Sequence, residues 1–430
     1  QASLCGDDQR LAPDPRLRYH LKQFPLDSLA QWLPKDFAWQ GLLNADINLD
    51  IPASGPKGTV VVDASGGTLR VKDKDRWIDF PYQALRLDST LAPRRIDTRL
   101  AFRGERLGEL NVTARLDPLG KNKPLSGDFR LAGLDLSVAR PFVPMVERLA
   151  GQLNGSGRLS GTLLAPQVNG NLMLSGGEVS GAELPASLQD LSLQALIAGE
   201  RVQLDGNWRS GEAGRGQLSG NLTWGQALGM DVRLQGQQLP VTVEPYATLE
   251  VAPDLTLRLI DDKLAVTGKV QVPKGKITVR ELPPSTVKVS DDTVIVGHQT
   301  EEGKPPMAMA MDIDVEVGRD KLSFSGFGLT ANLLGHVHIG DNLDTRGELS
   351  LADGRYRAYG QRLTIRRARL LFAGPIDQPY LDIEAIRKVD DVIAGIRLSG
   401  SAEQPTTKVF SEPAMSQEQA LSYLVLGRPL

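Results

Sequence analysis

The chain has 430 residues, a formal net charge of −3 and a single cysteine, Cys5. Its 49 basic and 52 acidic residues form no long blocks of one sign, which argues against a nucleic-acid-binding protein. One cysteine excludes an internal disulfide framework. Forty-four glycines, 27 prolines and 5% aromatic residues favour many strands joined by turns, and 41% hydrophobic content is too high for a disordered chain.

The ends of the chain suggest a piece of a longer protein. No window approaches the roughly 20 apolar residues of a spanning helix, and the first residues lack the charged and then apolar pattern of a signal peptide. Because the chain starts with Gln1, we expect a soluble fragment whose targeting segment lies upstream.

The amino-terminal half contains an internal repeat with a spacing of 110 residues. Matched positions are apolar or turn-forming in both copies and include Tyr19 and Phe129, Leu26 and Leu136, Trp32 and Phe142, Gly41 and Gly151, and Asn44 and Asn154. Segments 26–33 and 141–149, each around a proline, are predicted to form a few helical turns. The repeat is therefore architectural rather than catalytic.

A shorter motif recurs four times: a glycine, two apolar residues separated by one other residue, and a second glycine. It occupies residues 170–177, 268–275 and 347–354, and residues 58–67 with two extra positions. Each copy predicts a strand with alternating faces that runs into a glycine turn.

Apolar and polar residues alternate regularly from residue 191 onward. In the clearest example, Ile313, Val315 and Val317 face one side and Asp312, Asp314 and Glu316 the other. Many such strands without covering helices must pack as a solenoid or sandwich, or form an open trough. The packed forms are the usual answer and are favoured on fold physics alone. The modest supply of bulky side chains argues against them and suits a trough lined by aliphatic residues.

Two local signals stand outside this pattern. Residues 416–419 resemble a capping box that opens a short amphipathic helix through Leu421, Tyr423 and Leu424. The charged, proline-rich residues 299–306 predict a linker.

Candidate metal and catalytic residues are few. His336 and His338 lie two apart on a predicted strand, with Asp341 and Asp344 nearby, so a metal site is conceivable; solvated strand histidines are favoured. The row Asp312, Asp314 and Glu316 could act as paired carboxylates of a polysaccharide-cleaving enzyme, but alternation alone produces it. We therefore predict no enzyme, no metal and no cofactor.

The densest basic cluster comprises Arg355, Arg357, Arg362, Arg366, Arg367 and Arg369. It could meet phosphate headgroups or an acidic partner, but a solvated strand edge protected from aggregation by charge is favoured. The alternating apolar residues shift from odd positions, up to Ile365, to even positions, from Leu370, which predicts a turn or bulge near residues 366–369.

The carboxy-terminal sequences closely resemble one family. Runs 243–255, 268–273, 327–331, 347–361, 371–380 and 410–428 are similar to the TamB family, the inner-membrane component of the translocation and assembly module. The resemblance implies an all-β fold: an elongated, twisted open β-groove (β-taco) with an apolar concave face and a few short helices, as in AsmA-like and bridge-type lipid-transfer proteins. Residues 1–240 would form the repeat region and residues 241–430 the family's carboxy-terminal domain.

The same resemblance implies a Gram-negative periplasmic protein, anchored to the inner membrane through a segment absent here. Its partners would be phospholipids and TamA, an outer-membrane barrel of the BamA class, with no nucleic acid. The leading hypothesis is a lipid conduit between the membranes that supports outer-membrane homeostasis. The alternative is an assembly module that binds outer-membrane protein strands and TamA by β-augmentation.

The conduit hypothesis predicts residues that contact acyl chains on the apolar face. They are Leu255, Leu257, Leu259, Val270, Val272, Ile277, Val279, Ile313, Val315, Val317, Leu349, Leu351, Leu381 and Ile383.

Overall fold

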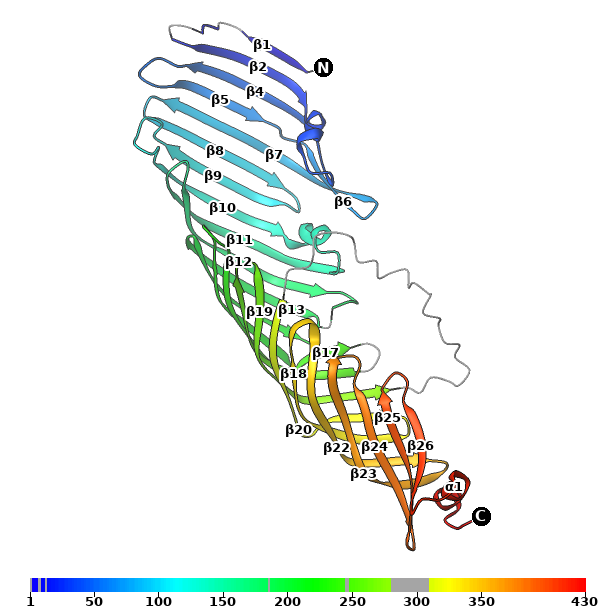
Figure 1. Ribbon diagram of the computed structural model, residues 1–430. Coiled ribbons are helices and arrows are strands. Elements are labelled where there is room, and N and C mark those ends of the chain that lie inside the picture. Colours follow the sequence, from blue (N-terminus) through cyan, green and yellow to red (C-terminus); the bar gives the residue numbers. More distant parts are fainter. Residues whose placement is uncertain (1, 7–8, 12–13, 185, 244–246, 280–308) are drawn as a thin grey trace. The chain divides into compact units, whose positions relative to one another are not determined.

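A computed structural model describes the chain except residues 1, 7–8, 12–13, 185, 244–246 and 280–308 (Figure 1). The linker expected at residues 299–306 lies outside the described residues. The chain divides into two compact units: unit 1 comprises residues 1–209 and 218–226, and unit 2 comprises residues 210–217 and 227–430.

Strands dominate both units. The first half of the chain forms β1 (Ser3–Gly6), β2 (Arg16–Pro25), β3 (Phe37–Gln40), β4 (Leu42–Asp50), β5 (Lys57–Asp63), β6 (Thr68–Asp73), β7 (Arg76–Ala92), β8 (Arg95–Gly104), β9 (Gly108–Leu116), β10 (Leu125–Asp135), β11 (Arg148–Gly161), β12 (Pro166–Ser180), β13 (Leu188–Gly199), β14 (Arg201–Ser210) and β15 (Gly214–Thr223). The 3-10 helices η1 (Leu26–Trp32) and η2 (Leu136–Phe142) follow β2 and β10.

The second half has the same character. It forms β16 (Gly229–Gln237), β17 (Leu239–Val243), β18 (Ala247–Ile260), β19 (Lys263–Val279), β20 (Met309–Gly326), β21 (Leu329–Ile339), β22 (Asp344–Ala358), β23 (Gln361–Pro375), β24 (Tyr380–Val389), β25 (Val392–Ser401) and β26 (Thr406–Glu412). A 3-10 turn, η3 (Asp341–Leu343), precedes β22, and one α-helix, α1 (Gln417–Leu426), follows β26.

Each unit is built on an open sheet in which chain neighbours pair. In unit 1, β1, β2, β4, β5 and β7 to β14 pair in this order and antiparallel, while β3 and β6 pair beside them with the start of β7. In unit 2, β18 to β26 pair in chain order, and only β19 and β20 among them run parallel. The predicted all-β, open-sheet class is confirmed.

Equivalent positions of the 110-residue repeat form equivalent hydrogen bonds. Both β2 and β10 carry a bulge at the same repeat position, where Gln23 and Gly133 adopt φ of 52° and 69°. In each copy the freed backbone N–H donates to the asparagine opposite, Asn44 at 2.9 Å and Asn154 at 2.8 Å. A helical turn follows at Leu26 as predicted.

The second helical prediction, residues 141–149, is wrong in position. The 3-10 helix spans residues 136–142, because the Asp135 side chain accepts a hydrogen bond from the backbone N–H of Ser137 and starts the helix there. Residues from Arg148 onward already belong to β11. The proline marks the end of this helix and not its beginning.

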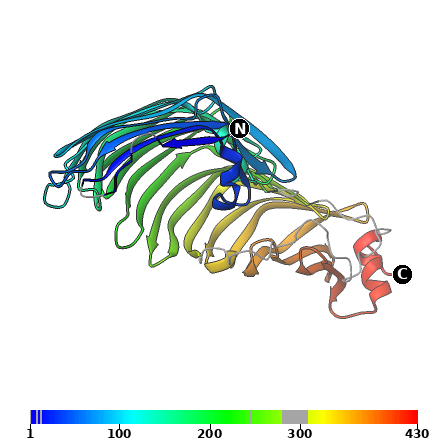
Figure 2. The same ribbon diagram turned by 90° about the horizontal axis from the view of Figure 1, so that it is seen from above.

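Three of the four glycine motifs lie inside strands, contrary to the sequence prediction. In the fourth, residues 58–67, strand β5 ends at Asp63 and the chain bends at Gly66, which has φ of 78°, as predicted. Residues 347–354 lie inside the continuous strand β22, and the register with β21 shifts between Thr330 and Asn332, beside Asp353 with φ of 54°. Motifs 170–177 and 268–275 likewise lie within β12 and β19 at register shifts. In these three copies the motif therefore marks a bulge within a long strand, and Figure 2 shows strands curving along their length.

The predicted irregularity at residues 366–369 is confirmed. The register of β23 with β24 shifts between Ile365 and Arg367, so one extra residue restores the apolar side chains to one face. Leu363 and Leu370, on either side of the shift, are 6% and 4% exposed.

The carboxy-terminal part of unit 2 has a packed core. Buried side chains of β19 to β25 form one cluster with Leu424 of α1. The predicted N-cap is confirmed, because the Ser416 hydroxyl accepts a hydrogen bond from the backbone N–H of Gln419 at 3.2 Å. The helix buries Ala420 and Leu424 rather than Leu421, which is 37% exposed.

Candidate functional site: the apolar sheet faces

Unit 1 carries an uninterrupted apolar row that crosses its sheet from β1 to β14. Each residue of the row is the register partner of the next, so the side chains share one face. The row consists of Leu4, Leu21, Ala45, Val62, Leu87, Leu100, Val112, Phe129, Gly157, Gly170, Ile197 and Val202. With strands about 4.8 Å apart, it extends for roughly 50 Å.

A second apolar row runs beside the first. It joins β7 to β14 through Leu85, Phe102, Leu110, Leu131, Gly155, Leu172, Ala195 and Leu204. The row between them points to the opposite face and is mostly polar, with Asn111, Arg130, Ser156 and Asn171 in register. The sequence alternation is thus translated into one apolar and one polar face.

Most side chains of the apolar rows are only half-buried. Val112, Phe129, Leu172 and Ile197 are each only partly buried. A sheet face of this kind is a candidate for binding an apolar ligand, because its apolar surface is still in contact with water.

Unit 2 places all fourteen candidate lining residues on one face. Val270 and Val315 are direct register partners across β19 and β20, and Leu349 and Leu381 both pair with Leu370. The bulges keep Ile277 and Val279 on the same face as Val270. The predicted alternation is confirmed, while acyl-chain contact at these positions stays a prediction.

The fourteen positions differ in burial. Val272, Val317, Leu349, Leu381 and Ile383 are 1–6% exposed members of the packed cluster, so protein side chains already occupy the space before them. By contrast, Leu255, Leu257 and Val270 are half-buried and lie outside that cluster. Sequence alternation could not separate these groups, because it reports the face of a strand and not what packs against it.

The polar face of unit 2 holds the histidines that sequence analysis considered as metal ligands. His338 Nδ1 lies 3.0 Å and His336 Nε2 3.3 Å from Asp314 Oδ1 on the neighbouring strand. The loop aspartates do not join them: Asp341 accepts a hydrogen bond from the backbone N–H of Met311. The hydrogen bond with His338 is the main cause that lowers the pKa of Asp314.

Asp312 and Asp314 therefore lie beside His336 and His338 on the polar surface of the strands. Within the described part of the chain, no group of three or more His, Cys, Asp or Glu residues could hold a metal ion.

Half of the arginine cluster forms an ion-pair network instead of a free strand edge. Glu384, 3% exposed, lies between Arg366, Arg367 at 3.5 Å and Arg397 at 3.6 Å. Asp382 pairs with Arg367 at 3.1 Å and Arg369 at 2.7 Å. The strand-edge prediction is wrong for β23, since β22 and β24 pair with it on either side.

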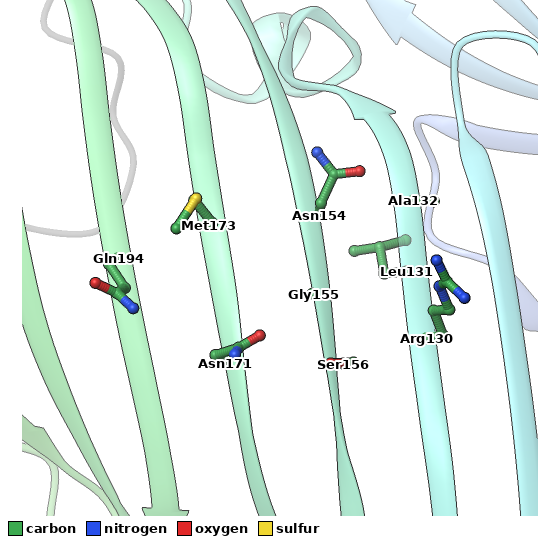
Figure 3. A pocket seen from close by; sticks show the side chains of 9 residues that line it. All are labelled: Arg130, Leu131, Ala132, Asn154, Gly155, Ser156, Asn171, Met173 and Gln194. Atoms are coloured by element: carbon green, nitrogen blue, oxygen red, sulfur yellow. The ribbon is translucent and has the colours of Figure 1, made fainter.

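A shallow hollow of about 440 Å³ lies on the polar face of unit 1 (Figure 3). Asn154, Asn171, Met173 and Gln194 reach it from β11, β12 and β13, and Arg130 reaches it from β10. Sequence analysis missed this hollow, because the residues come from four strands and carry no motif. Its polar lining does not suit an acyl chain.

The fold and its faces together define a class of protein: an open, one-faced β-sheet protein whose apolar face is left partly uncovered. No helix among the described residues is long and apolar enough to cross a membrane. The profile of the TamB C-terminal domain matches residues 204–430, and that of the TamB N-terminal domain matches residues 1–174. The chain belongs to the TamB family.

A curated relative supports this membership. The translocation and assembly module subunit TamB of Haemophilus influenzae is 28% identical over 356 residues, which cover 78% of this chain and 27% of that protein. The chain therefore spans little more than a quarter of the length of this relative.

Proposed function

We propose that this chain is part of a periplasmic lipid conduit, in which phospholipid acyl chains lie on the apolar faces of the two units. The observation that carries the proposal is the apolar row of unit 1, which crosses twelve strands without a polar side chain. No catalytic group is required, so the chain would not act as an enzyme.

The energetics favour such a surface for lipid movement. Exposing an acyl chain of about 16 carbons to water costs about 0.8 kcal/mol per methylene, on the order of 12 kcal/mol in total. A half-buried apolar row removes much of that cost at every step along it. A single polar side chain in the row would restore part of the barrier, which explains why continuity matters.

The wider setting follows from family membership. The Haemophilus influenzae relative is named a subunit of the translocation and assembly module. By extension, the full-length protein would be anchored in the inner membrane of a Gram-negative bacterium, act between the two membranes and cooperate with the barrel TamA.

A photo-crosslinking experiment tests the conduit. A benzophenone side chain at Val112 or Val270, on the apolar faces, should capture phospholipid in cells. The same group at the neighbouring Asn111 or Gln271, on the polar faces, should capture little. Equal lipid capture at the apolar-face and polar-face positions would contradict the proposal. Val270 is a better site than Val272, which is only 5% exposed.

A second candidate function is strand addition to outer-membrane proteins or to TamA. The observation that favours it is β26, which among the described residues pairs only with β25 and so presents an edge. Neighbouring residues direct their N–H groups alternately toward and away from β25, so proline at Thr407 or at Lys408 removes one edge donor. Under this alternative, one of the two proline variants should lose binding to outer-membrane protein strands or to TamA, while lipid crosslinking at Val112 is unchanged.

A further inference from the structure

The arginine cluster of residues 355–369 separates into two halves. Arg366, Arg367 and Arg369 are matched by carboxylates of neighbouring strands and of β26. Among the residues that the structure describes, none forms an ion pair with Arg355, Arg357 or Arg362. We call these three residues the basic tip, and all three are exposed.

The basic tip sits on the closed end of the β22–β23 hairpin. Arg357 and Arg362 are direct register partners, which places their Cβ atoms about 5 Å apart. The turn between the strands consists of Tyr359 and Gly360 with φ of 51° and 76°, the signs of a tight type I′ turn. Like charges that face each other across a hairpin repel, so this arrangement calls for an anion between or above them.

The hairpin is rigidly held from its other face. Tyr356 and Leu363, also register partners, are 6% exposed and belong to the packed cluster of unit 2. Alternation then directs the neighbouring arginines outward. The backbone N–H of Arg357 also donates to Gly328 O at 3.0 Å. The charges are therefore presented on a fixed support.

Two features favour a lipid surface over an acidic peptide. Tyr359 at the apex of the turn is 55% exposed, and tyrosine is a residue that settles at the headgroup level of a bilayer. Guanidinium groups bind phosphate oxygens in bidentate fashion. A peptide strand, in contrast, would find no free edge here, because β22 and β23 pair with β21 and β24.

We propose that the basic tip binds the phosphate groups of an anionic phospholipid bilayer and docks this end of unit 2 on a membrane surface. The inference rests on the proposed lipid role, because it gives the conduit a contact with the membrane that it serves. It can nevertheless be tested without lipid transfer.

The test is co-sedimentation of the chain with vesicles in which phosphatidylglycerol makes up one third of the lipid and phosphatidylcholine the rest. Binding should be strong at low salt and weak at high salt, and weak throughout on pure phosphatidylcholine. The triple variant R355S/R357S/R362S should bind the anionic vesicles about 100-fold more weakly, as expected for three basic residues at a charged surface. The variant Tyr359→Ser should bind a few-fold more weakly.

The matched control is K263S/K269S/K276S, which removes three exposed lysines of β19 and the same net charge. It should bind vesicles like the wild type, and the conservative variant R355K/R357K/R362K should keep most of the binding, which also controls for folding. Equal binding by wild type and R355S/R357S/R362S, equal weakening by the lysine control, or no binding to anionic vesicles would overturn the proposal. Lipid crosslinking at Val112 in R355S/R357S/R362S reports the conduit separately.

Discussion

Two glycines of β22 are required for different reasons. Gly347 has φ of 134°, and a Cβ atom there would lie 2.6 Å from His336 O of the neighbouring strand. Gly354 has ordinary backbone angles, but its Cβ would lie 2.3 Å from Cδ1 of Ile365. The first glycine is thus required by the backbone, and the second by one side chain that fills the space at the bulge.

This difference predicts two unequal substitutions. Gly347→Ala should destabilise unit 2 by about 2–3 kcal/mol, because neither the φ angle nor the carbonyl of β21 can adjust cheaply. Gly354→Ala should cost less, about 1 kcal/mol, since the end of a flexible side chain can move. Urea denaturation of each variant, monitored by hydrogen exchange in unit 2, measures both losses of stability. The double variant G354A/I365V should recover much of the loss, whereas I365V should not rescue Gly347→Ala.

The acidic residues of β24 are held by arginines of neighbouring strands. Burial alone raises the pKa of Asp382, but the hydrogen bond from Arg369 and the charges of Arg367 and Arg369 outweigh it and hold that pKa below its usual value. A carboxylate of this kind stabilises the folded state fully above its unfolded pKa of about 3.9 and progressively less as pH falls through its folded pKa.

The pH dependence of Asp382→Asn follows from this sign. At pH 7 the variant should be less stable than the wild type, and the difference in free energy of unfolding should shrink below about pH 4 as the wild-type carboxylate takes up a proton. Urea midpoints between pH 7 and pH 2.5 measure the difference. The exposed turn residue Asp391 provides the control, since Asp391→Asn should change little at either pH. A constant difference for Asp382→Asn would contradict this account.

At the scale of elements, the 3-10 helices η1 and η2 differ in their contacts with the neighbouring copy of the repeat. The helix η2 contacts the first copy of the repeat: Phe142 stacks on Phe37 with ring centroids 5.6 Å apart, and Arg140 forms an ion pair with Asp73. The equivalent residue of η1, Trp32, is 76% exposed. Equivalent positions of the repeat are therefore not equivalent in stability.

Phe142→Ala and Trp32→Ala form a matched pair of variants. Loss of the Phe142 stacking should destabilise unit 1 by about 1 kcal/mol, whereas loss of Trp32 should change its stability by less than about 0.5 kcal/mol. Tryptophan fluorescence during urea unfolding reports unit 1 alone, because all five tryptophans lie in it: Trp32, Trp39, Trp77, Trp208 and Trp224. A larger effect of Trp32→Ala would contradict the asymmetry.

At the scale of the whole molecule, the proposed conduit depends on continuity of the apolar faces rather than on any one side chain. The rows of unit 1 and the half-buried positions of unit 2 are open, while the carboxy-terminal part of unit 2 is packed with its own side chains and α1. Acyl chains would therefore lie against the open rows, and entry into the packed part would require its side chains to separate.

A charge in the row tests continuity. Val112→Asp should slow phospholipid transfer between vesicles, or lipid delivery in cells, by at least tenfold, because it places a costly carboxylate among Leu100, Phe129 and their neighbours. The control Asn111→Asp adds the same charge on the polar face and should leave transfer unchanged. Both variants should keep strand content by circular dichroism. Transfer that is insensitive to Val112→Asp would contradict the conduit.

The amino-acid sequence determined much of this description by itself. Alternation such as that of residues 311–317 fixes which side chains share a face, because it depends on local geometry with a fixed period. The first copy of the repeat also indicated the helical turn that begins at Leu26. The short helix could also be predicted, since Ser416 caps it through a contact three residues away.

Only the tertiary structure decided the rest. The motif of residues 347–354 did not indicate that its strand continues through both glycines. The need for glycine there comes from contacts with β21 and β23, which are distant in sequence. The pairing of Arg366 and Glu384 and the packing around Leu381 bring together residues far apart in sequence. Local patterns predict which face of a strand a side chain occupies. What packs against that face is set by long-range register, which no short motif encodes.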